Sequence, residues 1–287
     1  MTRANATRFL VLALCLSGGG GACALETSGA SRLFPGDGPV VICAPHGGRL
    51  KPSEVADRRQ GVLGEDANTA DLGLRLQQAI AARSGLKPAL LTCLWHRSKV
   101  DMNREEQEAA QGDPLAIAAW RHYHQLADQS VRAAVARHGR ILLIDLHGQS
   151  HPQNRVELGY LHDAADYAQA SRLKITDGSA ALLASLHQDL DYPAFLRGPQ
   201  SLGALLERAG FPATPSPREP IPSEPYFRGG YTLRRLTSGN PGVVGVQIEA
   251  NRNRLRDSAE GRQRFAEALA EAMLDYLPRW LLLKPGS

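Results

Sequence analysis

The chain has 287 residues, of which 43% are hydrophobic and 22% are charged, and its formal net charge is +4. This is ordinary globular composition, sufficient for one large domain or two small ones. Lys and Arg are spread along the sequence without a run of five or six, so nucleic acid is not expected as a partner.

Residues 1–24 have the order of a secretory signal peptide. Two arginines precede an apolar run over residues 9–16, which is too short to span a bilayer, and a Gly-rich stretch leads to the small-residue sequence at 22–24. We expect cleavage after residue 24, which leaves residues 25–287 as one domain, without a membrane span, in the periplasm or outside the cell. Lipidation at Cys23 is the less favoured alternative, because the residues before it lack the usual aliphatic side chain.

Strands and helices are expected to alternate along the rest of the chain. Unbroken apolar runs indicate buried strands, and stretches with helical periodicity lie between them. The expected strands span residues 39–44, 89–94, 141–146, 156–161 and 242–249. The expected helices begin near residues 66, 114, 201 and 257, the last at an Asp257 to Glu260 capping pair. Residues 26–38 are expected to be a loop, and residues 212–225, with six prolines, an extended one.

This alternation predicts an α/β fold with a mixed, mostly parallel sheet and helices on both faces. No G-x-G-x-x-G follows a strand and no Walker sequence is present, so nucleotide binding lacks support. The G-x-S-x-G elbow is also missing from the sequence, which counts against a serine hydrolase. Cys43 and Cys93 each lie near a strand end, either as a disulfide or as two buried thiols.

Two of the expected strands each end in a glycine-containing turn that carries a histidine, His46 and His147. Ligands collect at the carboxyl ends of strands in α/β sheets, and histidine is the commonest metal ligand. A catalytic zinc takes three protein ligands and leaves a fourth position for water. We therefore expect both histidines to bind zinc or another divalent ion together with a carboxylate. Asp66 is the favoured carboxylate, and Glu54 and Asp57 are the alternatives.

Several polar residues near the other strand ends are candidates for binding and catalysis. Asp145 could orient the ring of His147, or it could simply cap a turn. In the loop after residue 94, Arg104 could clamp a substrate carboxylate and Asn103 could hold that carboxylate or an oxyanion. The alternative is a solvated ion pair with Asp101.

Glu249 ends the last expected strand. A carboxylate there, close to a metal-bound water, could take its proton and pass it to a leaving nitrogen. The alternative is a Glu paired with Arg252 or Arg254. Upstream, Gly230 and Tyr231 belong to a glycine-containing segment that could bring the tyrosine to the substrate, or form a plain turn.

Taken together, these segments resemble the N-formylglutamate amidohydrolase (deformylase) family. Seven matching pieces occur in order, at residues 45–48, 66–72, 98–104, 123–124, 145–148, 229–232 and 242–249. The resemblance implies a fold related to zinc carboxypeptidases and aspartoacylases. The His-x-x-Glu spacing of carboxypeptidases is missing, because the residue three after His46 is Arg49.

The resemblance also implies roles for individual residues. His46, Asp66 and His147 would hold the metal, and Glu249 would be the general base. The Asn103–Arg104 pair would grip the substrate carboxylate.

The sequence thus predicts a zinc-dependent amidohydrolase acting on a small N-acyl amino acid such as N-formylglutamate. Two alternatives remain open, a periplasmic carboxypeptidase-like hydrolase of cell-wall peptides and a noncatalytic protein that binds an acidic ligand. The sequence makes no prediction of oligomeric state.

Overall fold

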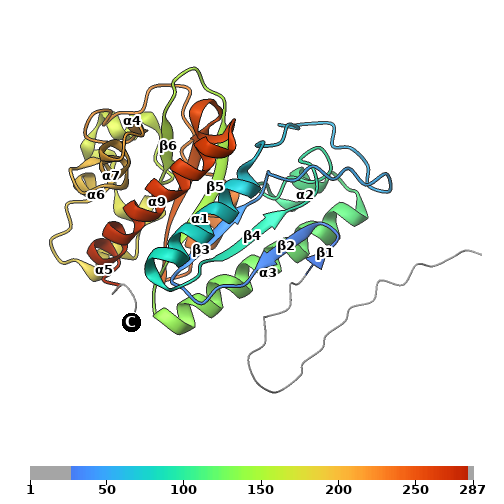
Figure 1. Ribbon diagram of the computed structural model, residues 1–287, viewed down its shortest axis with the longest axis horizontal. Coiled ribbons are helices and arrows are strands. Elements are labelled where there is room, and N and C mark those ends of the chain that lie inside the picture. Colours follow the sequence, from blue (N-terminus) through green and yellow to red (C-terminus); the bar gives the residue numbers. More distant parts are fainter. Residues whose placement is uncertain (1–26, 284–287) are drawn as a thin grey trace, which may run out of the picture.

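The computed structural model describes residues 27–283, and the segment expected to be a signal peptide lies outside them (Figure 1). A mixed eight-stranded sheet runs through the described chain in the order β1-β2-β4-β3-β5-β8-β6-β7. Its strands are β1 Thr27–Ser28, β2 Ser31–Phe34, β3 Val40–Ala44, β4 Ala89–Cys93, β5 Ile141–Gln149, β6 Val156–Gly159, β7 Ala213–Thr214 and β8 Val243–Asn251.

The four central strands β4, β3, β5 and β8 are parallel, so their carboxyl ends meet at one edge of the sheet. The longest pairing joins β5 to β8 and runs in register from Ile141 opposite Val243 to Gln149 opposite Asn251. β2 pairs with β4 and β6 pairs with β8 in the antiparallel sense. Every residue of β3, β4 and β8 is buried, including the polar residues near the carboxyl end of β8.

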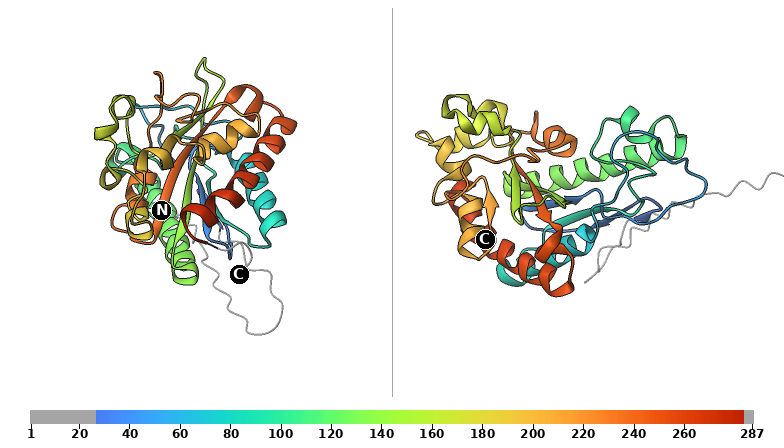
Figure 2. Two further views of the ribbon diagram at one scale, coloured as in Figure 1. Left: turned by 90° about the vertical axis from the view of Figure 1, so that its left-hand side faces the viewer. Right: turned by 90° about the horizontal axis from the view of Figure 1, so that it is seen from above.

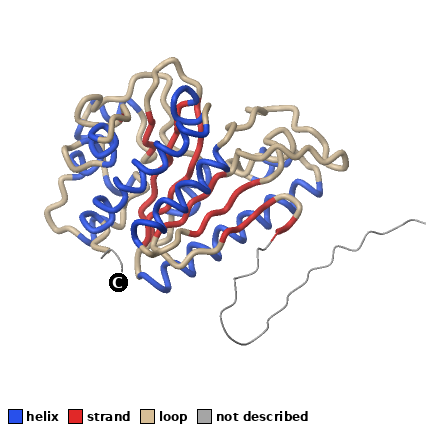
Figure 3. The backbone as a smooth tube through the Cα atoms, in the orientation of Figure 1, coloured by secondary structure: helices blue, strands red, loops and turns tan. Residues whose placement is uncertain are grey.

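Helices cover both faces of the sheet, which confirms the predicted fold class (Figure 2, left). On one face lie α1 Thr69–Ser84 and α9 Ala259–Trp280. On the other lie α3 Pro114–His138 and α8 Tyr231–Thr237. The shorter helices are α2 Glu106–Ala110, α4 Ala164–Ala168, α5 Leu183–Leu186, α6 Tyr192–Arg197, α7 Leu202–Arg208, η1 Ala170–Arg172, η2 Ile175–Asp177 and η3 Arg252–Arg256. Long loops join these elements, and the one after β3 extends beyond the sheet (Figure 3).

Each face of the sheet carries its own apolar core. Leu72, Leu76 and Phe265 belong to the core under α1 and α9. Tyr123, Leu126 and Leu233 belong to the core under α3 and α8. Because both faces are packed, side chains near the carboxyl ends of the central strands are held in a rigid frame.

The structure corrects five details of the predicted elements. Residues 26–38, expected to be a loop, contain the short edge strands β1 and β2. The segment of Gly230 and Tyr231 begins helix α8, and the polar loop after β4 contains α2. The last helix is capped by Ser258, whose side chain accepts from Gly261 N, rather than by Asp257.

The fifth correction concerns the start of α1, which begins at Thr69 rather than near Asp66. Asp66 N donates to His46 O at 2.9 Å, and this bond holds Asp66 in the turn before the helix. Asn68 then has a φ of 69°, which helical residues do not adopt. Asp66 therefore faces the end of β3 instead of belonging to the helix.

Cys43 and Cys93 are both buried and free, so the second of the two alternatives holds. Burial raises the pKa of Cys93 to about 12 and that of Cys43 further, which keeps both thiols protonated. No helix within residues 27–283 is both long and apolar enough to cross a bilayer.

Candidate metal centre

Two neighbouring parallel strands bring His46 and His147 together. Cys43 on β3 is opposite Asp145 on β5, and the two histidines follow these residues by three and two positions. His46 lies in the turn that follows β3, whereas His147 is still within β5. The loop after His46 returns to the strand end through the Asp66 N to His46 O hydrogen bond. Asp66 therefore meets both rings although it lies 20 residues beyond His46.

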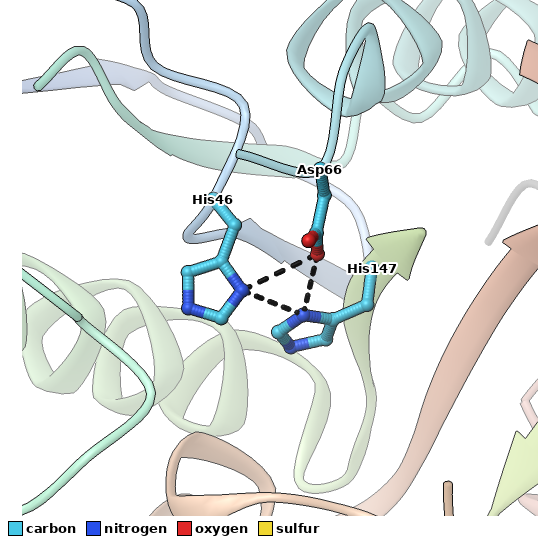
Figure 4. A group of neighbouring side chains, drawn as sticks. All are labelled: His46, Asp66 and His147. Atoms are coloured by element: carbon cyan, nitrogen blue, oxygen red, sulfur yellow. Dashed lines mark hydrogen bonds and ion pairs between the residues drawn. The ribbon is translucent and has the colours of Figure 1, made fainter. Parts of the chain in front are cut away.

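One side-chain atom each of His46, Asp66 and His147 form a compact triangle, called the metal triangle below (Figure 4). His46 Nδ1 lies 3.1 Å from His147 Nδ1 and 3.3 Å from Asp66 Oδ2, and His147 Nδ1 lies 3.1 Å from Asp66 Oδ2. Zinc bonds of about 2.0–2.1 Å in tetrahedral geometry separate neighbouring ligand atoms by about 3.3 Å. The triangle therefore has the size of one face of a tetrahedral metal site, and these three buried side chains could hold a metal ion.

A carboxylate lies behind each imidazole. His46 Nε2 is 2.7 Å from Asp101 Oδ1, and His147 Nε2 is 3.1 Å from Asp145 Oδ1. A ring whose Nε2–H points at a carboxylate keeps the lone pair of its Nδ1 for a metal. Asp101 is itself fixed, because it accepts from Arg97 Nε at 2.8 Å and from Asn103 N at 2.9 Å.

The site concentrates negative charge in the protein interior. Asp66, Asp101, Asp145 and Glu249 are all buried. Burial is the largest influence on Asp66 and Asp101 and would raise both pKa values. The imidazole of His46, together with His147 at Asp66 and Arg97 at Asp101, outweighs it and holds both pKa values below their usual range. Buried carboxylates of this kind require a paired cation.

A protonated His147 supplies positive charge next to these carboxylates. Burial would lower its pKa, but Asp145, Asp66 and Glu249 raise that pKa well above the usual value. The acids therefore favour positive charge at the point where a divalent ion would lie. Ion binding would displace the imidazole protons.

Glu249 lies next to the metal triangle on β8, directly opposite His147 in the ladder. Its Oε1 accepts from Gln247 Nε2 at 3.0 Å, and its buried Oε2 has no hydrogen-bond partner within residues 27–283. Burial raises the pKa of Glu249 to about 8, and the nearby acids Asp66, Glu157 and Asp145 add to this effect. The suggested pairing with Arg252 or Arg254 does not occur in the described chain, where neither arginine forms an ion pair with Glu249.

Asn103 connects the metal centre to α8. Its Oδ1 accepts from Thr232 N at 2.8 Å, and its Nδ2 lies 3.3 Å from His147 Nε2. Gly230 allows this close packing, because a Cβ there would overlap the Asn103 amide. Tyr231, the first residue of α8, packs edge-on against the ring of His124, with centroids 5.5 Å apart.

Arg104 lies beside Asn103 but outside the metal triangle. Its Nε pairs with Glu108 Oε1 at 2.9 Å, and its Nη1 donates to Asn103 O at 2.9 Å. The side chain is about one third exposed, so solvent and small molecules can reach it.

Of the three carboxylates considered from the sequence, Asp66 is the one that meets the histidines. Glu54 is exposed, and Asp57 pairs with Lys99 Nζ at 2.9 Å. Sequence reasoning missed the role of Asp101, which it treated as an ion-pair partner in a solvated loop. No spacing rule connects Asp101 to His46, which lie 55 residues apart in the sequence. Their hydrogen bond forms only because the loop after β4 folds back toward the turn after β3.

No family model matches the sequence, and no curated protein matches it. Solved structures do resemble it. One is an N-formylglutamate amidohydrolase from Ralstonia eutropha JMP134, with a TM-score of 0.58 and 15% identity over 88% of this chain and 99% of that chain. Another is a gene product of Agrobacterium tumefaciens, with a TM-score of 0.53 and 14% identity over 87% and 95% of the two chains. The predicted resemblance is therefore confirmed at the level of the fold.

Proposed function

We propose that this chain is a zinc-dependent amidohydrolase that cleaves the amide of a small N-acyl amino acid, such as N-formylglutamate. The observation that carries the proposal is the triangle of His46 Nδ1, His147 Nδ1 and Asp66 Oδ2, with Glu249 next to it in the sheet. The similarity of the fold to an N-formylglutamate amidohydrolase supports the choice of substrate class.

The donor set supports zinc as the ion. Two imidazole nitrogens and one carboxylate oxygen are the ligands of many catalytic zinc sites, whereas magnesium and calcium prefer oxygen alone. When bound, zinc acts as a Lewis acid that polarises a carbonyl oxygen and lowers the pKa of water to about 7.

Residues around the triangle supply the remaining functions of the proposed enzyme. Glu249 takes a proton from the attacking water in its ionised form, which a cation held by the triangle would favour because positive charge lowers the pKa of a neighbouring carboxyl. Its Oε2 has no other partner within residues 27–283. Arg104 anchors the substrate carboxylate through its Nη2, which makes no hydrogen bond within the described chain, while Asn103, Gly230 and Tyr231 shape the same side of the site. The N-terminal segment supports export to the periplasm or the medium.

Metal analysis and substrate assays test the proposal together. The purified protein is expected to contain about one zinc per chain, to lose activity on N-formyl-L-glutamate when a chelator removes the ion, and to regain it with added zinc. N-acetyl amino acids and peptidoglycan peptides, assayed alongside, define the acyl group and separate this reading from a cell-wall hydrolase. A protein that holds no divalent metal and cleaves no N-acyl amino acid contradicts the proposal.

Replacing the proposed base separates an enzyme from a binding protein. Glu249→Gln is expected to keep its zinc and its substrate affinity but to lose about 10²–10⁴-fold in kcat, since a positioned base contributes that much. Glu271→Gln, an exposed glutamate on α9, is the matched control and should behave as the unchanged chain does. Unaltered turnover in Glu249→Gln would remove this residue from the mechanism.

A further inference from the structure

A second acid–imidazole pair lies beside the metal centre, formed by His151 and Glu157. His151 Nδ1 is 2.8 Å from Glu157 Oε1, and the other carboxylate oxygen accepts from Phe227 N at 3.0 Å. Glu157 is completely buried, whereas 15% of the His151 side chain is exposed. The imidazole packs against the ring of Phe227, with centroids 4.7 Å apart. Neither residue belongs to the metal triangle, and the proposed function gives them no role.

The backbone of His151 is fixed to the two strands that carry His147 and Glu249. Gln149 Oε1 accepts from His151 N at 2.6 Å, and Asn251 Nδ2 donates to His151 O at 3.0 Å. Gln149 and Asn251 lie two positions beyond His147 and Glu249, so all four side chains point to the same face of the sheet. The loop that carries His151 is therefore held against the catalytic strand ends.

The sheet register places this pair next to Glu249. Glu249 is opposite His147 on one side and opposite Glu157 on the other. Because neighbouring strands are about 4.8 Å apart, the backbones of His147 and Glu157 are about 10 Å apart, with Glu249 between them. His151 is therefore attached to the neighbour of the proposed base, on the side away from the metal ligands.

Glu157 holds one ring nitrogen of His151 and leaves the other free. With Nδ1 as the donor to Glu157, Nε2 is the nitrogen available to a substrate. The charged groups beside Glu157 are Glu249, opposite it in the ladder, and Arg155, whose Nη2 lies 3.6 Å from Glu157 Oε1 and which also pairs with Glu219. A buried carboxylate behind an imidazole orients the ring and supports proton transfer at the far nitrogen, as in hydrolases that use such pairs.

We propose that His151 is a second proton carrier of the active site, the acid that protonates the leaving nitrogen, and that Glu157 is its positioning residue. This inference rests on the proposed amidohydrolase function. Glu249 takes one proton from the attacking water while a C–O bond forms at the carbonyl carbon. The C–N bond then breaks, its electron pair goes to nitrogen, and nitrogen takes the Nε2 proton of His151. The proton on Glu249 returns to His151 through solvent, so amide and water give a carboxylic acid and an amine.

A comparison of two leaving groups tests the proposal. His151→Gln is expected to lower kcat/KM on the N-acyl amino acid about 10²-fold or more. On a p-nitrophenyl ester of the same acyl group the loss should be much smaller, because nitrophenolate leaves without a proton. The zinc content should be unchanged. His138→Gln is the matched control, because His138 lies at the opposite edge of the sheet, where its Nε2 contacts Asp37 O at 2.7 Å.

Glu157→Gln gives an independent measurement and identifies the role of Glu157. It keeps the imidazole but removes the carboxylate that holds Nδ1, so it should show the same selective loss on the amide over the ester, smaller than that of His151→Gln. This variant also gives a result if His151→Gln folds poorly.

Four outcomes would overturn the inference. Equal losses on amide and ester in His151→Gln mean that the pair only fixes the Phe227 segment. Loss of zinc in this variant means that the pair supports the metal site instead. Undiminished amidase activity in His151→Gln rejects the role of His151 and leaves the proposed function standing. An unchanged chain without amidase activity rejects the proposed function and this inference with it.

Discussion

At the scale of single residues, the metal triangle depends on what lies behind each ring. The two histidines present the same nitrogen, Nδ1, to one point. The Nε2 of His46 is hydrogen-bonded to Asp101, and the Nε2 of His147 lies 3.1 Å from Asp145 Oδ1. Such carboxylates fix the tautomer, limit ring rotation and make the ligand nitrogen more basic. Asp101 is the better placed of the two, since its contact with His46 is 2.7 Å long and its other oxygen is held by Arg97.

Asp101→Asn is therefore expected to weaken zinc binding about 10–100-fold without removing a ligand. The neutral amide accepts the Nε2–H bond less strongly and leaves His46 less basic. Competition with a chromophoric chelator measures the change. Asp275→Asn, an exposed aspartate on α9, is the control. Zinc affinity equal to that of the unchanged chain, with an unchanged melting temperature, contradicts the role assigned to Asp101.

At the scale of elements, the helix α8 packs against the candidate site. The first residues of this helix contact Asn103, which in turn touches His147. On its other side α8 packs on β8, where a Cβ at Gly245 would lie 2.6 Å from Leu233 Cδ1. The helix thus joins the strand of the proposed base to the loop that contains Asn103 and Arg104.

Gly230→Ala is expected to disturb this junction. The added Cβ overlaps the Asn103 amide, so the amide or the start of α8 must move, and overpacking of this kind costs about 1–3 kcal/mol. Activity should fall together with the free energy of unfolding, measured in urea. Gly29→Ala adds the same methyl group where no atom lies within 4 Å, and it should leave both quantities unchanged. A fully stable and active Gly230→Ala chain would show that the contact is not needed.

An element could be predicted from the sequence when a local pattern of residues determines it, and not when contacts with distant residues do. Central strands and the helices α1, α3 and α9 were predicted because continuous apolar runs and periodicity are local properties of the sequence. The strand β2, second from one edge of the sheet, and the helix α8 were missed because contacts with β4 and Asn103, distant in sequence, determine them.

The residues of the site also fall into those that a local sequence pattern predicts and those that it does not. His46 follows a buried strand and His147 lies near the carboxyl end of one, and both positions are visible in the sequence from the apolar runs before them. The Asp101 contact and the His151–Glu157 pair arise only when loops fold back onto strand ends, and no spacing rule predicts this.

At the scale of the whole molecule, a buried histidine in the core under α3 and α8 contributes to the pH dependence of the stability. His124 is buried between α3 and α8, and neither ring nitrogen has a hydrogen-bond partner within residues 27–283. Burial, assisted by Arg235, lowers its pKa to about 3. The folded chain therefore holds this imidazole neutral, while the unfolded chain protonates it near pH 6.5.

The consequence is a loss of stability on acidification. Above pH 6.5 both states are neutral at His124 and the residue adds no pH dependence. Between pH 6.5 and 3 the unfolded state binds a proton that the folded state does not, so the free energy of unfolding falls by about 1.4 kcal/mol per unit, or about 2 kcal/mol by pH 5. His124→Phe keeps an aromatic ring against Trp120 and Tyr231 but cannot titrate, so its loss between pH 7 and pH 5 should be smaller by that amount.

Urea unfolding of both metal-free chains at the two pH values measures this difference. The other histidines and the buried acids titrate equally in both chains and cancel in the comparison. His138→Phe, which changes a histidine on the surface end of α3, should keep the full pH dependence. Equal losses in the unchanged chain and in His124→Phe would mean that His124 is protonated inside the folded protein. The α3–α8 core would then have to accommodate a charge, which its apolar packing against Leu126 and Leu233 opposes.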